Sequence, residues 1–186
     1  EVLVLSDLHA AGYASYGKAT GHAAILGTGS VLFEWGQEEI KNITGGLGHM
    51  NGDEGSGFFF GKLIYDEFVS KSLTKEERAS FVQHVNTDQL EIDFELGNHK
   101  ISFSNVAFLL KDETVLFSRF HQENFRLFTE KYLINHSIDH LTIVGSYGHS
   151  QKVYIEQLFN KYRMNSVSFI ARPLEQLIEQ MDLFVD

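Results

Sequence analysis

The sequence contains no cysteine, and this absence excludes several kinds of chemistry. Disulfide bonds, thiolate nucleophiles and cysteine-rich zinc sites all need the thiol group. A chain without cysteine also suits a reducing compartment, and we expect a cytoplasmic location. Proline is almost as rare: Pro173 is the single one, and the apolar periodicity after it predicts that it takes the first position of a closing helix.

Long apolar runs and basic charge are scarce as well. No apolar run approaches the roughly 18 residues that a membrane-spanning helix needs, so we expect no membrane association. With 15 Lys and Arg against 25 Asp and Glu, the net charge is −10. The chain therefore offers no basic footprint for a phosphate backbone, and nucleic-acid binding is disfavoured. A small phosphorylated ligand stays possible, because backbone N–H groups can hold it.

The remaining composition is that of a folded globule. The chain has 186 residues, of which 43% are hydrophobic and 13% aromatic, enough for one ordinary domain with a real core. No linker, repeat or low-complexity stretch divides it, so we predict a single unit over residues 1–186. The apolar residues 2–5 directly after Glu1 predict a buried strand. Because a native N-terminus rarely falls there, we expect the chain to be the later part of a longer protein.

A glycine-rich stretch over residues 44–57 is the most distinctive part of the sequence. Glycine can adopt φ > 0 and lets a ligand approach the main chain closely. The stretch runs into residues 53–56, where acidic side chains before an apolar periodic run predict the first turn of a helix. The alternative interpretation is an ordinary glycine-rich turn capped by Asp53.

Two further bends contain glycine and hydroxyl residues. Gly27-Thr28-Gly29-Ser30 follows an apolar run at residues 22–26, and its N–H and hydroxyl groups could surround an anion, although an ordinary hairpin has the same residues. A third bend, residues 145–148, follows a buried strand at 141–144 and precedes a helix. Main-chain amides at these bends would form a seat for a nucleotide and its acceptor.

Asp7 follows the strand predicted at residues 2–5 and therefore lies at the carboxyl end of a strand. Open α/β sheets bind their ligands at that edge, so Asp7 is a candidate functional carboxylate. The alternative is that Asp7 only caps the helix predicted at about 8–17. The two roles are compatible, because a capping side chain at a strand end can also face a ligand.

Periodicity predicts the remaining elements. Residues 31–35 and 38–43 should be strands joined by a tight turn at Gly36-Gln37, and 167–170 a further strand. Residues 90–96 alternate between apolar and polar side chains with a period of two, which also predicts a strand. Helices are expected at 57–73, after a capping box at Thr74, around 103–110 and over 113–135. Phe58-Phe59-Phe60 should lie in the core rather than form a base-stacking platform. His136 and His140 have metal-ligand spacing, but no carboxylate pattern accompanies them, so metal binding is not favoured.

These motifs together resemble a known family. The bends at 27–30, 45–56 and 144–146, with Ser6-Asp7-Leu8-His9-Ala10-Ala11 before them, resemble in sequence and order the N-acetylglucosamine kinase branch of the BadF/BadG/BcrA/BcrD ATPase family. The resemblance covers essentially the whole chain. It implies an α/β actin-like ATPase fold of two RNase H-like lobes, of which this chain would be the C-terminal lobe, a mixed sheet flanked by helices. It also implies two substrates, ATP with Mg²⁺ and an amino sugar.

The resemblance also implies roles for individual residues. Asp7 matches the general base that takes the proton of the sugar hydroxyl, a role that suits a carboxylate within hydrogen-bond reach of the acceptor. The other matches are ATP-binding positions at Gly27, Thr28, Gly29, Gly145 and Ser146, and sugar-binding positions at Ser30, Gly46, Leu47, Gly48 and Asp53.

The sequence departs from the family at two places. Leu47 stands where close relatives have tryptophan, which affects stacking on the sugar. The family's first phosphate loop, an Asp-Gly-Gly-Thr-Lys-Thr-like hairpin of the N-terminal lobe, has no match here. Without that loop, one side of the triphosphate and its Mg²⁺ has no protein contacts, since the ion would be held mainly by the phosphates and by that lobe. We therefore expect this segment alone to be inactive.

Two other functions remain open from the sequence. The first is a module that senses a sugar or nucleotide without phosphorylating it, since a fold does not fix a function. The second is an ATPase that activates a partner protein, although its hallmark cysteines for an iron–sulfur cluster are absent. A homodimer formed through the helices of residues 57–135 is also possible.

Overall fold

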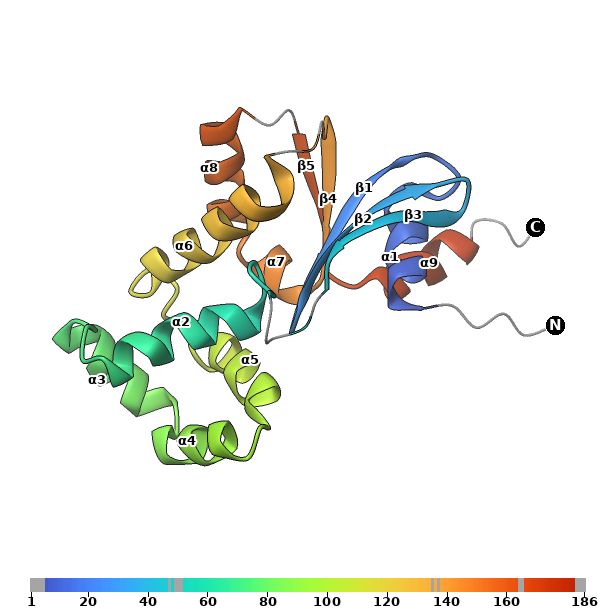
Figure 1. The fold of residues 1–186 in the computed structure, drawn as a ribbon. Helices are drawn as coiled ribbons and strands as arrows, with labels where there is room; N and C mark the ends of the chain where they lie inside the picture. The colour runs from blue at the N-terminus through green and yellow to red at the C-terminus, as the bar shows by residue number, and fades with distance from the viewer. Residues whose placement is uncertain are drawn as a thin grey trace.

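The fold is a mixed β-sheet with helices on both faces (Figure 1). The computed structural model describes residues 6–46, 48, 52–134, 136, 138–163 and 166–182, without the side chains of 179–182. The strand predicted at residues 2–5 and the candidate residue Leu47 lie outside the described residues.

The sheet has five strands in the order β3-β2-β1-β4-β5. A meander of antiparallel strands, β1 to β3, is followed by β4 and β5, which run parallel to β1. The carboxyl ends of β1, β4 and β5 therefore meet at one edge of the sheet, as in other open α/β sheets. The strands are β1 (Gly21–Leu26), β2 (Ser30–Gly36), β3 (Glu39–Gly45), β4 (His140–Val144) and β5 (Ser166–Ile170).

Helices cover the two faces of the sheet unequally (Figure 1). One face carries α1 (Asp7–Tyr16) and α9 (Pro173–Asp182). The helices on the other side are α2 (Gly57–Val69), α6 (Ser118–Phe128), the π-helix η1 (Thr129–Leu133), α7 (Ser146–Ser150) and α8 (Lys152–Tyr162). Beyond them lie α3 (Lys75–His84), α4 (Thr87–Glu95) and α5 (His99–Leu109). Pro173 is the first residue of α9, as predicted.

Each face has its own hydrophobic core. Side chains from β1, β2 and β4 alternate between the two, because successive residues of a strand point to opposite faces. Ala24, for example, belongs to the core beside α2 and α6, whereas Ala23 belongs to the core beneath α1. Phe58 and Phe60 are buried in the former, so the core prediction for them is confirmed.

One predicted strand is wrong. The alternating segment 90–96 lies in α4 and its C-cap, where Leu90 is the one buried residue of the helix while Phe94 is 51% exposed. The Asn86 side chain accepts a hydrogen bond from the N–H of Gln89 and so caps the helix. The local cap favours the helix. The alternation of apolar and polar residues does not favour a strand here, because most of the apolar side chains in the segment are exposed.

Several predicted boundaries shift by a few residues. Ser6, and not Asp7, is the N-cap of α1, since its Oγ accepts from the N–H of His9. Helix α2 begins at Gly57 with Ser56 as its N-cap, so Asp53 lies in the preceding turn. The predicted helix over 113–135 is α6 and η1, preceded by turns, and the helix predicted over 57–73 ends at Val69.

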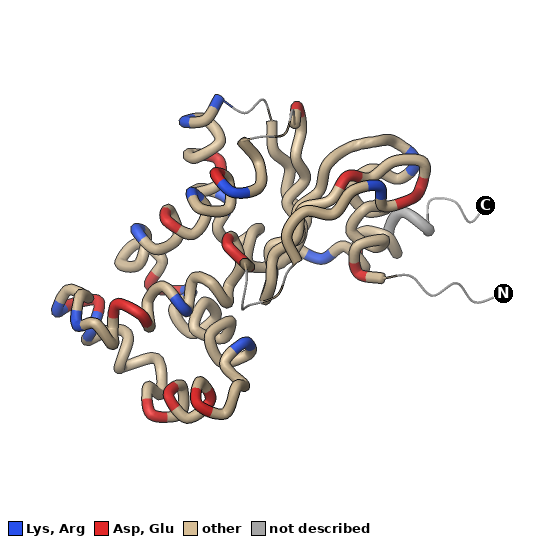
Figure 2. The backbone as a smooth tube through the Cα atoms, in the orientation of Figure 1, with Lys and Arg blue, Asp and Glu red and all other residues tan. Residues whose placement is uncertain are grey.

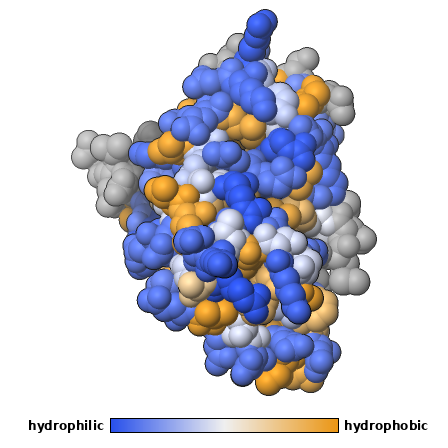
Figure 3. All heavy atoms as spheres, turned by 90° about the vertical axis from the view of Figure 1, so that its left-hand side faces the viewer, coloured by the Kyte–Doolittle hydropathy of each residue, from blue (hydrophilic) through white to orange (hydrophobic). Residues whose placement is uncertain are grey.

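The surface mixes charged and apolar residues. Lys and Arg are interspersed with Asp and Glu over the helical half, as Figure 2 shows. On the face drawn in Figure 3, hydrophobic side chains form separate patches between hydrophilic ones. Within the described chain, no helix is both long and apolar enough to cross a membrane.

Candidate functional site

The bend between β1 and β2 is joined directly to the start of α2. The carbonyl oxygen of Gly27 accepts from the N–H of Gly57 at 2.8 Å, and that of Thr28 accepts from the N–H of Phe58 at 3.3 Å. The next amide, of Phe59, donates to Ser56 Oγ at 3.1 Å. The first amides of α2 are therefore all engaged within the protein. A ligand therefore cannot bind these amides without replacing one of the hydrogen bonds.

The bend also meets the end of β4. Gly145 has φ of 114°, and a Cβ at this position would lie 2.9 Å from the carbonyl oxygen of Leu26. Glycine is thus required here, both for the positive φ and for the close approach of β4 to the end of β1. The N–H of Gly145 donates to the carbonyl oxygen of Ile170 at 2.8 Å. This arrangement directs the chain into α7, whose first residue is Ser146.

A cavity of about 400 Å³ lies between the β1–β2 bend, α5 and α7. Three of the five predicted ATP-binding residues line it: Gly27, Thr28 and Ser146. The remaining walls come from α2, α5 with the turn after it, and α7. The full lining is Gly27, Thr28, Gly57, Ser104, Asn105, Ala107, Phe108, Lys111, Ser146, Tyr147 and Ser150.

The sequence predictions missed the contribution of α5 to this cavity. The apolar residues that predict this helix are Phe103, Val106, Ala107 and Leu110, and of the residues within α5 Phe103 and Val106 are buried. Ala107, together with the polar Ser104, lines the cavity instead. Helical periodicity identifies the face that is buried in the core, but it does not predict whether the opposite face lines a cavity or contacts solvent.

Asp53 lies next to the same bend and is buried, with 2% of its surface exposed. Its Oδ1 accepts from the N–H of Ser30 at 3.2 Å, and a Cβ on Gly29 would lie 3.2 Å from the same oxygen. Among the described residues, Asp53 Oδ2 and Ser30 Oγ have no hydrogen-bond partner. Asp53 also has φ of 72°, an uncommon conformation for a residue with a side chain. Buried carboxylate oxygens without a partner are costly, so a ligand that donates hydrogen bonds would stabilise this site.

The other predicted sugar-binding residues are only partly connected to Asp53. The N–H of Gly46 donates to the carbonyl oxygen of Ser30 at 3.1 Å, which joins the end of β3 to the same bend. Gly48 has φ of 78°, and a Cβ there would meet no atom within 4 Å. The structure thus brings Ser30, Gly46 and Asp53 together.

Asp7 lies on the other face of the sheet, at the first position of α1, and is exposed. Its Oδ1 accepts from the N–H of Leu8 at 2.9 Å. The start of α1 and the β1–β2 bend lie toward the same lower end of the sheet in Figure 1. Asp7 is nevertheless not among the described residues that line the cavity.

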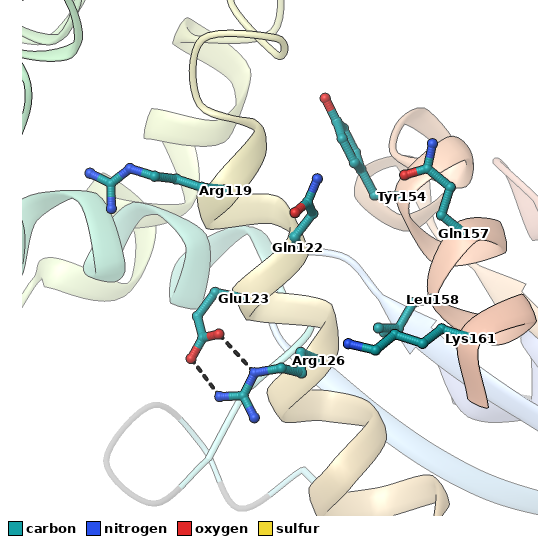
Figure 4. Close-up of a pocket in the computed structure, with 8 residues that line it drawn as sticks. All are labelled: Arg119, Gln122, Glu123, Arg126, Tyr154, Gln157, Leu158 and Lys161. Atoms are coloured by element: carbon teal, nitrogen blue, oxygen red, sulfur yellow. Dashed lines mark hydrogen bonds and ion pairs between the residues drawn. The ribbon is translucent and has the colours of Figure 1, made fainter.

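A second cavity, of about 340 Å³, lies between α6 and α8 (Figure 4). Its basic residues include Arg119 and Arg126, but both guanidinium groups already bind carboxylates. Arg126 pairs with Glu123 at 2.7 Å and with Glu130, and the side chain of Arg119 points away from the cavity toward α2. None of the predicted site residues that the structure describes lines this cavity, so it is not the candidate site.

Histidine does not form a metal centre in the part of the chain that is described. No group of three His, Cys, Asp or Glu side chains there has the arrangement of a metal site. The ring nitrogens of His140 instead lie 2.6 Å from Ser166 Oγ and 3.1 Å from Ser168 Oγ.

The sequence matches no protein-family model and no curated protein sequence. Its fold, however, is similar to solved structures. A provisionally named N-acetylglucosamine kinase from Porphyromonas gingivalis matches with a TM-score of 0.79 and 23% identity, over 91% of this chain and 62% of that one. A second provisionally named N-acetylglucosamine kinase, from Chromobacterium violaceum, matches with a TM-score of 0.64 and 17% identity, over 92% of this chain and 62% of that one.

These comparisons establish the fold. The predicted actin-like ATPase fold, with a mixed sheet flanked by helices, is confirmed. The chain spans about 62% of the length of each of the two relatives. At identities of this size the likeness does not extend to activity, and membership of the BadF/BadG/BcrA/BcrD family stays a prediction.

Proposed function

We propose that this chain is the C-terminal lobe of an ATP-dependent amino-sugar kinase that transfers the γ-phosphoryl group to a sugar hydroxyl. The observation that carries the proposal is the convergence of separate segments at one place. The β1–β2 bend, α5 and α7 border a cavity, and the buried carboxylate of Asp53 lies beside the same bend. The names of the two structural relatives agree with a sugar kinase.

The cavity supports a nucleotide subsite. A volume of about 400 Å³ falls in the range of small-molecule sites. Its walls combine apolar side chains, such as Ala107 and Phe108, with the hydroxyls of Ser104, Ser146 and Ser150. An adenosine group needs this combination, since its base is flat and apolar on both faces and its ribose carries hydroxyl groups. Gly27 and Thr28 would then lie toward the phosphates, and Gly145 and Ser146 toward the nucleoside.

The surroundings of Asp53 support a sugar subsite. A sugar hydroxyl donates a hydrogen bond, and Asp53 Oδ2 is a buried acceptor without a described partner. Ser30 Oγ is a second buried polar atom without a described hydrogen-bond partner. Such hydrogen bonds discriminate well, because an analogue that lacks the hydroxyl leaves the buried carboxylate unpaired.

Asp7 is the proposed general base. As the sugar oxygen attacks the γ-phosphorus, the bond from that phosphorus to the β-bridging oxygen breaks and ADP leaves. The hydroxyl proton passes to the Asp7 carboxylate. Mg²⁺ would neutralise phosphate charge, and it would be held mainly by the phosphates and by the N-terminal lobe that the two-lobe proposal requires.

The proposal is tested by ADP release from the complete two-lobe protein, with and without N-acetylglucosamine. We expect ADP release that depends on the sugar. Asp53→Asn should raise the KM for the sugar by about 10- to 100-fold, the usual effect of losing a hydrogen bond to a charged group. Asp66→Asn, an exposed aspartate of α2 that pairs with Lys62, is the matched control and should leave the KM unchanged.

Two outcomes would contradict the kinase proposal. Sugar binding without sugar-dependent ADP release would favour the sensing module. ADP release that needs a partner protein instead of a sugar would favour the ATPase that activates a partner.

A further inference from the structure

Asn124 of α6 is fully buried and makes three hydrogen bonds to two different turns. Its Oδ1 accepts from the N–H of Gly55 at 2.6 Å. Its Nδ2 donates to the carbonyl oxygen of Ser56 at 2.9 Å and to the hydroxyl of Tyr147 at 3.1 Å. Both protons of the amide nitrogen therefore have a partner, and no other side chain of the described core makes this connection.

The first of these turns carries Asp53. Gly55 has φ of 89°, and the N–H and Oγ of Ser56 both donate to the carbonyl oxygen of Asp53, at 3.0 Å and 2.5 Å. Asp53 itself has a positive φ, which costs on the order of 1 kcal/mol or more. Such a conformation persists only where its surroundings hold it, and Asn124 binds two successive residues of the turn.

The second turn begins α7. Tyr147 follows Ser146 and lines the cavity, and its ring packs against Phe125 with centroids 5.7 Å apart. Because Asn124 donates to the Tyr147 oxygen, the hydroxyl proton of Tyr147 is available for His121 Nδ1, 3.1 Å away. The hydroxyl of Tyr147 thus links Asn124 to α7 in a chain of hydrogen bonds.

This chain of hydrogen bonds keeps one charge state near neutral pH. Burial raises the pKa of Tyr147, and it lowers the pKa of His121 to about 3. Tyr147 therefore stays protonated and His121 stays neutral near pH 7. The hydrogen bonds keep the same donors and acceptors there, so the connection is not a pH switch.

We propose that Asn124 is a positioning residue that couples the sugar turn, residues 53–56, to the nucleotide turn, residues 145–148. The inference rests on the proposed function, because it needs both ligands. A ligand that binds either turn stabilises the hydrogen bonds of Asn124, and these also hold the other turn, so the second ligand meets a turn whose binding conformation is already more populated. Each ligand consequently raises the affinity for the other, by the same factor in both directions.

The test measures binding of N-acetylglucosamine to the complete protein by calorimetry, with and without a non-hydrolysable ATP analogue. For the wild type we expect the analogue to raise the sugar affinity by about fivefold or more, the lower end of typical coupling. Asn124→Asp keeps the shape but donates at most one hydrogen bond, and none when ionised, so it cannot bind both Ser56 and Tyr147. It should abolish the coupling and also weaken sugar binding alone. Tyr147→Phe removes one link and should abolish the coupling with a smaller loss of sugar affinity than Asn124→Asp.

Gln122→Glu is the matched control, because it adds the same charge to an exposed position of the same helix and should keep the wild-type coupling. Thermal melting checks that each variant is folded, and Tyr147→Phe carries the test if Asn124→Asp does not fold. Coupling that persists in folded Tyr147→Phe would overturn the inference. Wild type that phosphorylates the sugar but shows no coupling would overturn the inference alone, whereas wild type that binds neither ligand would overturn the proposed function with it.

Discussion

The two faces of the sheet are packed with different kinds of residue. Beneath α1 and α9 the core consists of alanine and branched aliphatic residues around Phe33 and Trp35. On the opposite face, phenylalanines from α2, α5, α6 and α8 form a much larger core. Small residues let a helix lie close to the sheet, while large aromatic residues fill the wide space between several helices.

The faces also differ in how they hold the proposed site residues. On the aromatic face, Asp53 and Ser146 lie on turns fixed by contacts distant in the sequence, such as the hydrogen bond between Gly55 and Asn124. On the other face, Asp7 is held by its own helix, through the N–H of Leu8. The ligand turns therefore depend on tertiary packing, whereas the proposed base depends mainly on the placement of one helix.

The largest expected effect is on turnover, from a substitution at the start of α1. Asp7→Asn in the complete protein should lower kcat by two to four orders of magnitude, the usual contribution of a general base, with little change in stability. Asp88→Asn, which changes an exposed acid in the first turn of α4, is the control for loss of charge at a helix start. Steady-state kinetics and thermal melting measure the two quantities. Near-normal turnover in Asp7→Asn would exclude Asp7 as the base.

One glycine in each core contacts a neighbouring element closely, so substituting alanine for each compares how well the two cores accept an added methyl group. A Cβ on Gly61 would lie 2.1 Å from the backbone oxygen of Phe103, so Gly61→Ala must separate α2 from α5. We expect a loss of about 3 kcal/mol in the free energy of unfolding by urea. A Cβ on Gly12 would lie 2.2 Å from the ring of Trp35, a fully buried side chain. A ring moves by side-chain torsions alone, whereas the contact of Gly61 is with a helix backbone, so Gly12→Ala should cost less, about 1–2 kcal/mol.

Lys62→Ala is the control for Gly61→Ala, because Lys62 is the neighbouring residue and its side chain is exposed. It should change the unfolding free energy by less than about 0.5 kcal/mol. If Gly12→Ala proved more destabilising than Gly61→Ala, the small-residue core would be the less adaptable of the two.

Two arginines of α6 form different kinds of ion pair, one with other helices and one within its own helical segment. Arg119 binds Glu67 and Glu77, which come from other helices, whereas Arg126 binds Glu123 and Glu130 of its own helical segment. Arg119→Ala leaves the buried Glu77 carboxylate without its cationic partner, with the N–H of Thr74 as its remaining donor, and should cost about 2 kcal/mol, allowing for the half-exposed guanidinium. Arg126→Ala should hardly move the urea midpoint. Equal losses in the two variants would contradict this distinction.

The same pair predicts a dependence on pH. The hydrogen bond from Arg119 lowers the pKa of Glu77 below its ordinary value, despite the opposing effect of burial. A lowered folded-state pKa contributes stability that is present above the unfolded pKa and is lost as pH falls through the folded pKa. Unfolding midpoints should therefore fall below about pH 4.5, and the fall should be smaller in Glu77→Gln. A Glu77→Gln profile that follows the wild type would place the acid-sensitive group elsewhere.

Local signals explain what the sequence could predict. The Thr74 capping box is present, with Thr74 Oγ1 accepting from the N–H of Glu77 and the Glu77 carboxylate accepting from the N–H of Thr74. The bend at residue 145 was identifiable because Gly145 has a positive φ, which favours glycine. The bend at 27–29 was identifiable because its small residues directly follow an apolar run. Strand, glycine turn and helix in succession were sufficient to predict the α/β class.

Long-range contacts explain what the sequence could not predict. A single asparagine within α6 gives no pattern, yet Asn124 bonds to residues 68 and 69 positions earlier and 23 later. The role of α5 in the cavity likewise depends on which helix packs opposite. The tight turn was expected at Gly36-Gln37 because glycine favours turns, but strand pairing of Gly36 with Glu39 places it at Gln37-Glu38.

That turn provides the smallest expected effect, on the hairpin that forms the outer edge of the sheet. Gln37 and Glu38 have φ of 56° and 62°, as a type I′ turn requires, although both residues carry side chains. Replacing them with Asn-Gly should stabilise the protein by about 1 kcal/mol or less, because these residues tolerate the left-handed conformation. Urea unfolding measures the gain. Asn-Gly at positions 36–37 is the control and should destabilise, because it moves the turn out of register with β3; a gain there instead would mean that the hairpin can shift by one residue.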